Sequence, residues 1–194
     1  MNAHARVMAH RARSRRRRSS GQALVEFAAF FVFIMLLIAG IVDIGGLLDD
    51  HVSIEYATRQ GARTAAVLGN QSTADCAIIG AIDAAVSNMP NMVINQIIIY
   101  KAGSNGLPLG TSTETSYPGN TLCTVSGSTF SLSQFPILNN YPPANRSNLA
   151  FAEDSVGVEL DYTYTFQLPL LGSGTFSASD RTIMPVSPIV IATP

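Results

Sequence analysis

The longest apolar run in the chain extends over Phe27–Val42 and contains no polar side chain. Within the wider window Ala23–Leu48, only Glu26 and Asp43 are charged. A helix over residues 22–42 would be about 31 Å long at about 1.5 Å per residue, which matches the thickness of the hydrocarbon core of a bilayer. A helix in the core of a soluble protein normally has a polar stripe, and this run has none. The pattern therefore predicts a transmembrane helix.

The helical spacing continues after this run. Apolar residues recur at helical intervals between Ile44 and Ala66, with charged residues between them. Gly69 and Asn70 form a plausible helix end, so we expect one long helix up to about residue 68. A second, shorter helix is expected over residues 74–88, because Pro90 would stop it.

The period then changes to that of strands. Residues 92–100 are rich in β-branched side chains, and residues 156–167 alternate between apolar and polar positions. Residues 175–184 are expected to pair with the latter strand across a turn at 170–174. Residues 102–148 are rich in Gly, Ser, Thr, Asn and Pro, and indicate long loops with one short strand near 122–125. The sequence thus predicts an α+β fold, in which a long N-terminal helix packs on a small antiparallel sheet.

Charge is distributed unevenly along the chain. Seven of the twelve Lys and Arg residues lie in the first eighteen positions, and all thirteen Asp and Glu residues come later. Basic residues before a membrane helix keep that end in the cytoplasm. We therefore expect a cytoplasmic leader at 1–21, a transmembrane helix at 22–48 and an extracytoplasmic head at 49–194. The acidic head offers no basic surface for nucleic acid, and the arginine run, which could bind nucleic acid in isolation, indicates membrane topology in this position.

A cleaved secretory signal peptide is the alternative interpretation of the N-terminus. The apolar run is longer than the core of such a signal, and no small-x-small site followed by a polar break ends it. Arg15 and Arg16 resemble a twin-arginine signal only superficially, because those signals have a weaker hydrophobic region. We therefore expect the helix to be retained as an anchor.

The two cysteines, Cys76 and Cys123, both lie in the predicted head. Disulfides persist outside the cytoplasm, and closing this loop would stabilise the fold by about 4 kcal/mol on a chain-entropy estimate. We predict a disulfide between them, with two unpaired buried thiols as the alternative.

Glu26 is unusual, because a carboxylate near the start of a membrane helix is costly. One interpretation places it at the headgroup level, where it favours the helix N-terminus through the macrodipole. The other interpretation depends on Gly21. A cut after Gly21 would give Gln22 a new, positively charged amine, and Glu26 would lie four residues further along on the same helical face. The two charges could then neutralise each other within one subunit or between neighbours.

The segment from Arg15 to Phe27 resembles the leader of type IV prepilins, with a basic run, Gly21 before the cleaved bond, Glu26 at the fifth mature position and an apolar helix. The run GQALVEFA, followed by IVDIGGLLDD and EYATRQGARTAA, is similar to the TadE-like family of minor pseudopilins from tight-adherence (Tad or Flp) pilus systems. The resemblance covers roughly residues 20–68. Phe27 stands where the major pilins of these systems usually carry Tyr, and the chain is far longer than those pilins. Both points favour a minor component.

The resemblance implies a pilin-like protein of the bacterial cytoplasmic membrane, possessing a single membrane pass. A membrane prepilin peptidase would cut between Gly21 and Gln22, and Glu26 would take part in subunit packing. Its partners would be other pilins and pilus-assembly proteins. The alternative function is a permanently anchored envelope protein whose head binds a partner or the cell wall. The first interpretation predicts a mature N-terminus at Gln22, and the second predicts an intact leader.

Patterns typical of catalysis or metal binding are weak. The sequence has no phosphate-binding loop or serine-nucleophile motif, and its cysteines lack C-x-x-C spacing. Asp49, Asp50 and His51 could bind a cation, although a solvated helix face explains such a cluster more simply. Glu159 and Asp161 share one strand face without an identifiable acid–base partner. We expect no enzyme activity, metal, cofactor or small-molecule substrate; a membrane-tethered enzyme would need a cleft with convergent polar groups in the head.

Overall fold

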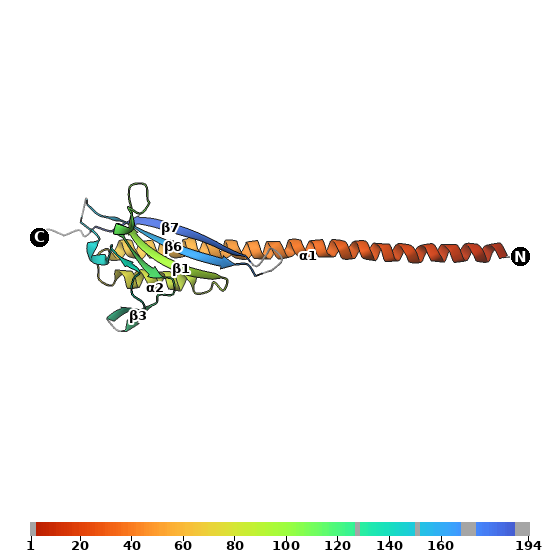
Figure 1. The fold of residues 1–194 in the computed structure, drawn as a ribbon, viewed down its shortest axis with the longest axis horizontal. Helices are drawn as coiled ribbons and strands as arrows, with labels where there is room; N and C mark the ends of the chain where they lie inside the picture. Colours follow the sequence, from red (N-terminus) through yellow and green to blue (C-terminus); the bar gives the residue numbers. More distant parts are fainter. Residues whose placement is uncertain (1–2, 127–128, 150–151, 168–173, 189–194) are drawn as a thin grey trace. The chain divides into compact units, whose positions relative to one another are not determined.

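The structure is a computed structural model that describes residues 3–126, 129–149, 152–167 and 174–188. Its contacts divide the chain into two units, Met1–Ile44 and Gly45–Pro194. Helix α1 (Ala3–Leu68) supplies the helical part of the first unit and continues into the second (Figure 1). The prediction of one long helix that ends near residue 68 is confirmed. The helix also includes the leader from Ala3 onward, which the sequence pattern did not predict.

The second unit contains helix α2 (Ala74–Val86) and a five-stranded antiparallel sheet with the order β5-β2-β1-β6-β7. Its strands are β1 (Met92–Lys101), β2 (Glu114–Pro118), β5 (Leu138–Asn139), β6 (Ser155–Thr165) and β7 (Thr175–Pro185). Two further strands, β3 (Cys123–Ser126) and β4 (Thr129–Leu132), form a separate two-stranded ribbon. A long helix with a small antiparallel sheet is the α+β fold that the sequence predicts.

Strand β6 confirms the predicted alternation. Its even-numbered residues from Val156 to Tyr164 are all buried in the core. β6 pairs with β7 without a register shift, from Ser155 opposite Pro185 to Thr165 opposite Thr175. The turn expected at 170–174 lies almost wholly outside the described residues.

Strand β1 contains a bulge that its sequence already signals. The apolar positions Met92 and Ile94 are even-numbered, whereas Ile97 and Ile99 are odd-numbered. The pairing with β6 shifts between Ile94 and Gln96, so that all four side chains lie opposite core positions of β6. One extra residue, Asn95, therefore restores the apolar face after the change of phase.

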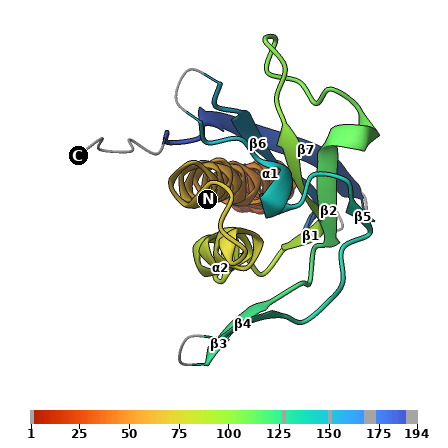
Figure 2. The same ribbon diagram turned by 90° about the vertical axis from the view of Figure 1, so that its left-hand side faces the viewer.

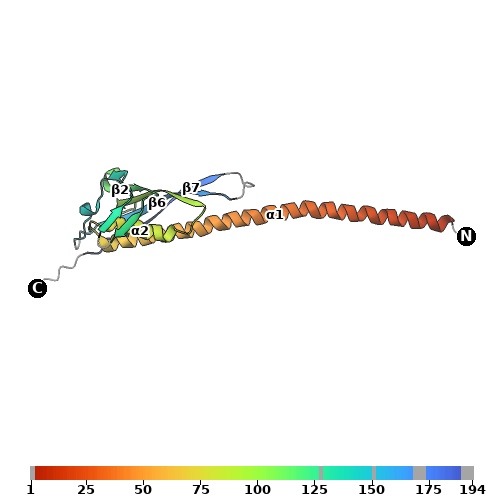
Figure 3. The same cartoon turned by 90° about the horizontal axis from the view of Figure 1, so that it is seen from below.

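Helices α1 and α2 lie side by side on one face of the sheet (Figure 2), and the sheet follows the last turns of α1 (Figure 3). Small residues permit this close packing. A Cβ atom added to Gly61 of α1 would lie 3.1 Å from Ile82 of α2 and 3.2 Å from Val158 of β6. Gly61 therefore allows α1 to approach both the second helix and the sheet.

The region 102–148, expected to consist mainly of loops, contains more strand than the sequence indicates. The short strand expected near 122–125 is present as β3, but β2, β4 and β5 were not predicted. β2 pairs with β1, yet its fully buried residues include Thr115 and Ser116. Buried hydroxyl groups do not produce the apolar alternation by which a strand is recognised.

Candidate functional site

The start of the apolar helix brings Gln22 and Glu26 together. The side-chain amide of Gln22 donates a hydrogen bond to Oε1 of Glu26 at 3.0 Å, one turn along the exposed surface of α1. Gly21 precedes them in open space, since a Cβ atom added there would meet nothing within 4 Å. The contact shows that residues 22 and 26 share one helical face. An amine placed on residue 22 would therefore lie near a carboxylate.

Large apolar side chains between Leu24 and Val42 are exposed along α1. Transfer of apolar surface out of water is favourable by about 25 cal/mol per Å², so a long exposed apolar surface indicates contact with lipid or protein. In the described part of the chain, one helix is long and apolar enough to cross a bilayer by length and composition. Together these features indicate a membrane helix.

The predicted disulfide between Cys76 and Cys123 is present. It joins the first turn of α2 to the first residue of β3. The β3–β4 ribbon is otherwise largely exposed, and an isolated two-stranded hairpin is marginally stable in water. The disulfide therefore anchors the ribbon to the head.

A buried ion pair joins Asp75 of α2 to Arg146. The side chain of Arg146 is 0% exposed and that of Asp75 is 6% exposed. The Tyr117 hydroxyl donates to Oδ2 of Asp75 at 2.8 Å. Burial, followed by the negative charge of Asp75, raises the pKa of Tyr117, which keeps this hydroxyl protonated. Nε and Nη1 of Arg146 have no hydrogen-bond partner within the described protein.

A second polar cluster continues from Arg146 through Tyr141. The Arg146 guanidinium lies 5.4 Å from the centroid of the Tyr141 ring, and the Tyr141 hydroxyl donates to Oδ2 of Asp154 at 2.9 Å. Lys101 Nζ lies 2.6 Å from Oδ1 of the same carboxylate. Burial alone would raise the pKa of Asp154, but Lys101 and the hydrogen bonds from Ser147 and Tyr141 outweigh it, so the pKa is lowered. The two carboxylates are thus each held by a cation and a tyrosine.

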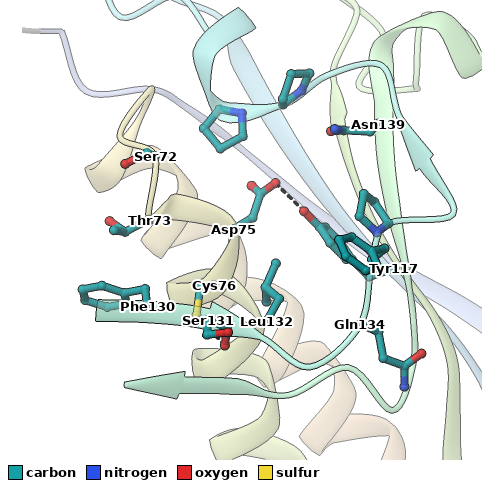
Figure 4. A pocket seen from close by; sticks show the side chains of 14 residues that line it. Ser72, Thr73, Asp75, Cys76, Tyr117, Phe130, Ser131, Leu132, Gln134 and Asn139 are labelled. Atoms are coloured by element: carbon teal, nitrogen blue, oxygen red, sulfur yellow. Dashed lines mark hydrogen bonds between the residues drawn. The ribbon is translucent and has the colours of Figure 1, made fainter. Parts of the chain in front are cut away.

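An open pocket of about 580 Å³ lies between the N-terminus of α2, strand β4 and the loops around β5. Figure 4 shows Asp75 and Tyr117 joined by their hydrogen bond in this pocket, with Phe130 and Leu132 of β4 among the other lining side chains. Most of the lining is apolar, aromatic or uncharged polar. The one carboxylate in the lining, that of Asp75, has both oxygens engaged by Tyr117 and Arg146.

The cation-binding interpretation of Asp49, Asp50 and His51 gains no support from the geometry. His51 Nδ1 lies 2.9 Å from the Tyr162 hydroxyl, which places the ring against the sheet. Asp50 is buried, its Oδ2 has no partner among the described residues, and its pKa is raised by burial and by Asp49. No group of three possible metal ligands is present in the described ranges.

Sequence reasoning did not find the Asp75–Arg146 pair or the pocket. The two residues are 71 positions apart, and no local pattern links them. The available signal was weaker: Arg146 is the first charged residue after a charge-free run from Thr115 to Asn145.

An exposed apolar helix near the N-terminus and an α+β head indicate a single-pass membrane protein. Residues 21–63 match the model of a family described as TadE-like protein, which confirms the resemblance seen in the sequence. No curated protein and no solved structure matches the chain. The family match begins at Gly21 and lies within α1, so it concerns the helix and not the sheet or the ribbon. The match and the apolar helix fit a membrane-anchored protein related to tight-adherence pili.

Proposed function

We propose that this chain is a minor pseudopilin of a tight-adherence pilus, a structural component anchored in the cytoplasmic membrane with its head outside. A prepilin peptidase cuts between Gly21 and Gln22, and the new amine of Gln22 is neutralised by Glu26. The observation that carries the proposal is the 3.0 Å contact between the side chains of Gln22 and Glu26, at the point where the family match begins. Neutralisation reduces the cost of keeping a carboxylate in the membrane.

The experiment is intact-mass measurement and N-terminal sequencing of the membrane-extracted protein, produced with and without a prepilin peptidase. A peptidase-dependent start at Gln22 supports the proposal. Gly21→Val should block this cut, and Gly40→Val is its matched control, because both glycines have open space around them. A leader that is retained in the presence of the peptidase contradicts processing.

Glu26 has a test of its own. Glu26→Gln retains a hydrogen-bond acceptor for Gln22 but removes the charge. We expect this variant to be processed normally and to lose association with other pilus subunits, measured by co-purification after mild crosslinking. Association at the wild-type level would show that the charge of Glu26 has no role in packing.

A permanently anchored envelope protein is the second candidate. The observation that favours it is the continuity of α1 from Ala3 through Gly21, because a peptidase would have to unwind the helix to reach the bond. For this candidate the protein keeps all of its leader arginines, and the head binds a partner or the cell wall without entering a filament. The same N-terminal measurement separates the two candidates.

A further inference from the structure

One long segment of the head carries no charged side chain. The run from Thr115 to Asn145 contains no Asp, Glu, Lys, Arg or His, and its described residues form β2, the ribbon, β5 and neighbouring loops. We call the exposed part of this run the neutral face. Its large apolar side chains are exposed to solvent, namely Leu122, Val125, Phe130, Phe135 and Ile137. A cluster of exposed large apolar residues marks an interaction surface.

The neutral face has both a highly exposed aromatic side chain and a pocket. Phe135 is 93% exposed, so it contributes almost nothing to the core of its own head. It also lies at the rim of the 580 Å³ pocket, whose lining includes Phe130, Pro136 and Pro142. A protruding aromatic ring and an aromatic and proline-lined cavity therefore occur side by side. A surface that carries both complementary shapes can bind a copy of itself around a two-fold axis.

Charge disfavours a basic partner at the neutral face and does not oppose a second copy there. From Gly45 onward the chain has eleven Asp and Glu residues against five Lys and Arg residues, so two heads carry net charge of the same sign and repel each other. A basic partner would gain attraction from acidic residues in its interface, yet this face has none. Two acidic heads can meet without placing like charges opposite each other only through a surface that has no charges. The single carboxylate in the pocket, Asp75, is already paired with Arg146.

We propose that two copies of this chain associate through the neutral face, with Phe135 of each copy inserted into the pocket of the other. The paired contact is isologous, and it buries the exposed rings of Phe130 and Phe135 in both heads. Anchoring in one membrane would raise the effective concentration of the heads. Dimerisation through the neutral face does not require processing at Gly21 and is compatible with either candidate function.

The test is photo-crosslinking of the full-length chain in membranes, with p-benzoylphenylalanine in place of Phe135. Co-expression of two differently tagged copies identifies a homodimer adduct. The matched position is Phe176 of β7, which is also exposed but lies outside the neutral face. We expect a homodimer adduct from position 135 and none from position 176. The yield should not fall as salt is raised, because the contact contains no free charge and salt screens the repulsion between the acidic heads.

A pocket-filling variant tests the insertion itself. Ser131 lines the pocket, so Ser131→Trp should occupy the space required by the partner ring and lower the adduct yield about thirtyfold, the scale of one aromatic hot spot. Ser126→Trp is the control, since Ser126 is exposed on the same ribbon and does not line the pocket. Equal yields from the two variants, an adduct mainly with another protein, an equal adduct from position 176, or no dimer adduct would each overturn the proposal.

Discussion

Breaking the buried pair between Asp75 and Arg146 by removing one partner should destabilise the head strongly. In Arg146→Met, the Asp75 carboxylate stays buried and retains only the hydrogen bond from Tyr117. In Asp75→Asn, the Arg146 guanidinium stays buried without an anion. Each variant leaves one uncompensated charge that is almost wholly removed from solvent, and burial of an unpaired charge is costly.

The expected magnitude follows from burial. Both side chains of the pair are at most 6% exposed, and loss of one partner of a buried pair costs about 3–5 kcal/mol. The double variant has no buried charge at this position, so its loss should be smaller than the sum of the two single losses. We expect a coupling energy of about 2–3 kcal/mol. The exposed pair Glu55–Arg59, whose side chains are 43% and 60% exposed, provides the contrast, because such pairs contribute about 0–1 kcal/mol.

The assay is urea unfolding of the full chain in detergent micelles, followed by near-ultraviolet circular dichroism of tyrosine. The chain has six Tyr residues and no Trp, and Tyr117 and Tyr141 both contact the pair, so the signal reports directly on this region. Arg59→Met is the control for the same chemical change at the surface. If Arg146→Met lowers the free energy of unfolding no more than Arg59→Met does, or if the two single losses simply add, the reasoning from burial is refuted.

Three further predictions concern the same free energy of unfolding. Asp154 has a lowered pKa because Lys101 and two hydrogen bonds outweigh its burial, so its contribution is present above the unfolded pKa of about 3.9 and is lost as pH falls through the lower folded value. Asp154→Asn should therefore flatten the loss of stability below about pH 4 in acid urea titrations, and an unchanged slope would contradict this. A Cβ atom at Gly157 would overlap the Tyr100 ring, so Gly157→Ala should lower the free energy of unfolding by about 1–3 kcal/mol. If the variant unfolds at the same urea concentration as the wild type, the Tyr100 ring can move aside without cost. Ile82 is fully buried between the helices and the sheet, and Ile82→Ala should cost about 2–5 kcal/mol, with a lower thermal midpoint as the readout and no shift as the contrary outcome.

The elements that could be predicted from the sequence are those whose own residues form a clear pattern of apolar and polar positions. The alternation in Val156–Gln167 gave the core face of β6, and the apolar run Phe27–Val42 gave the membrane part of α1. The phase change in 92–100 also contained the position of the bulge in β1. In each case one stretch of sequence faces one environment, so its residue types report that environment directly.

The missed elements depend on residues that are distant in sequence. β2 buries Thr115 and Ser116 because β1 and β5 flank it on both sides, and its own residues do not show this. The Thr115 hydroxyl accepts a hydrogen bond from the backbone N–H of Tyr141 at 3.1 Å, which satisfies a polar group that would otherwise argue against burial. The pocket is likewise made by α2, β4 and separate loops, and no spacing rule brings these together. The pairing of Gln22 with Glu26 was predictable, since it depends only on helical geometry.

The strand order affects the tendency of these heads to aggregate when many copies lie close together. β5 and β7 are the two edge strands of the sheet. β5 has only two residues, and β7 carries Asp180 and Arg181 at its middle and Pro185 at its end. A short edge strand, and charged residues or proline on an edge strand, all hinder the addition of a further strand. Copies that are crowded in a membrane are thereby hindered from pairing edge to edge into cross-β aggregates. Ordered contacts between the heads then depend on side chains and not on backbone hydrogen bonds between sheets.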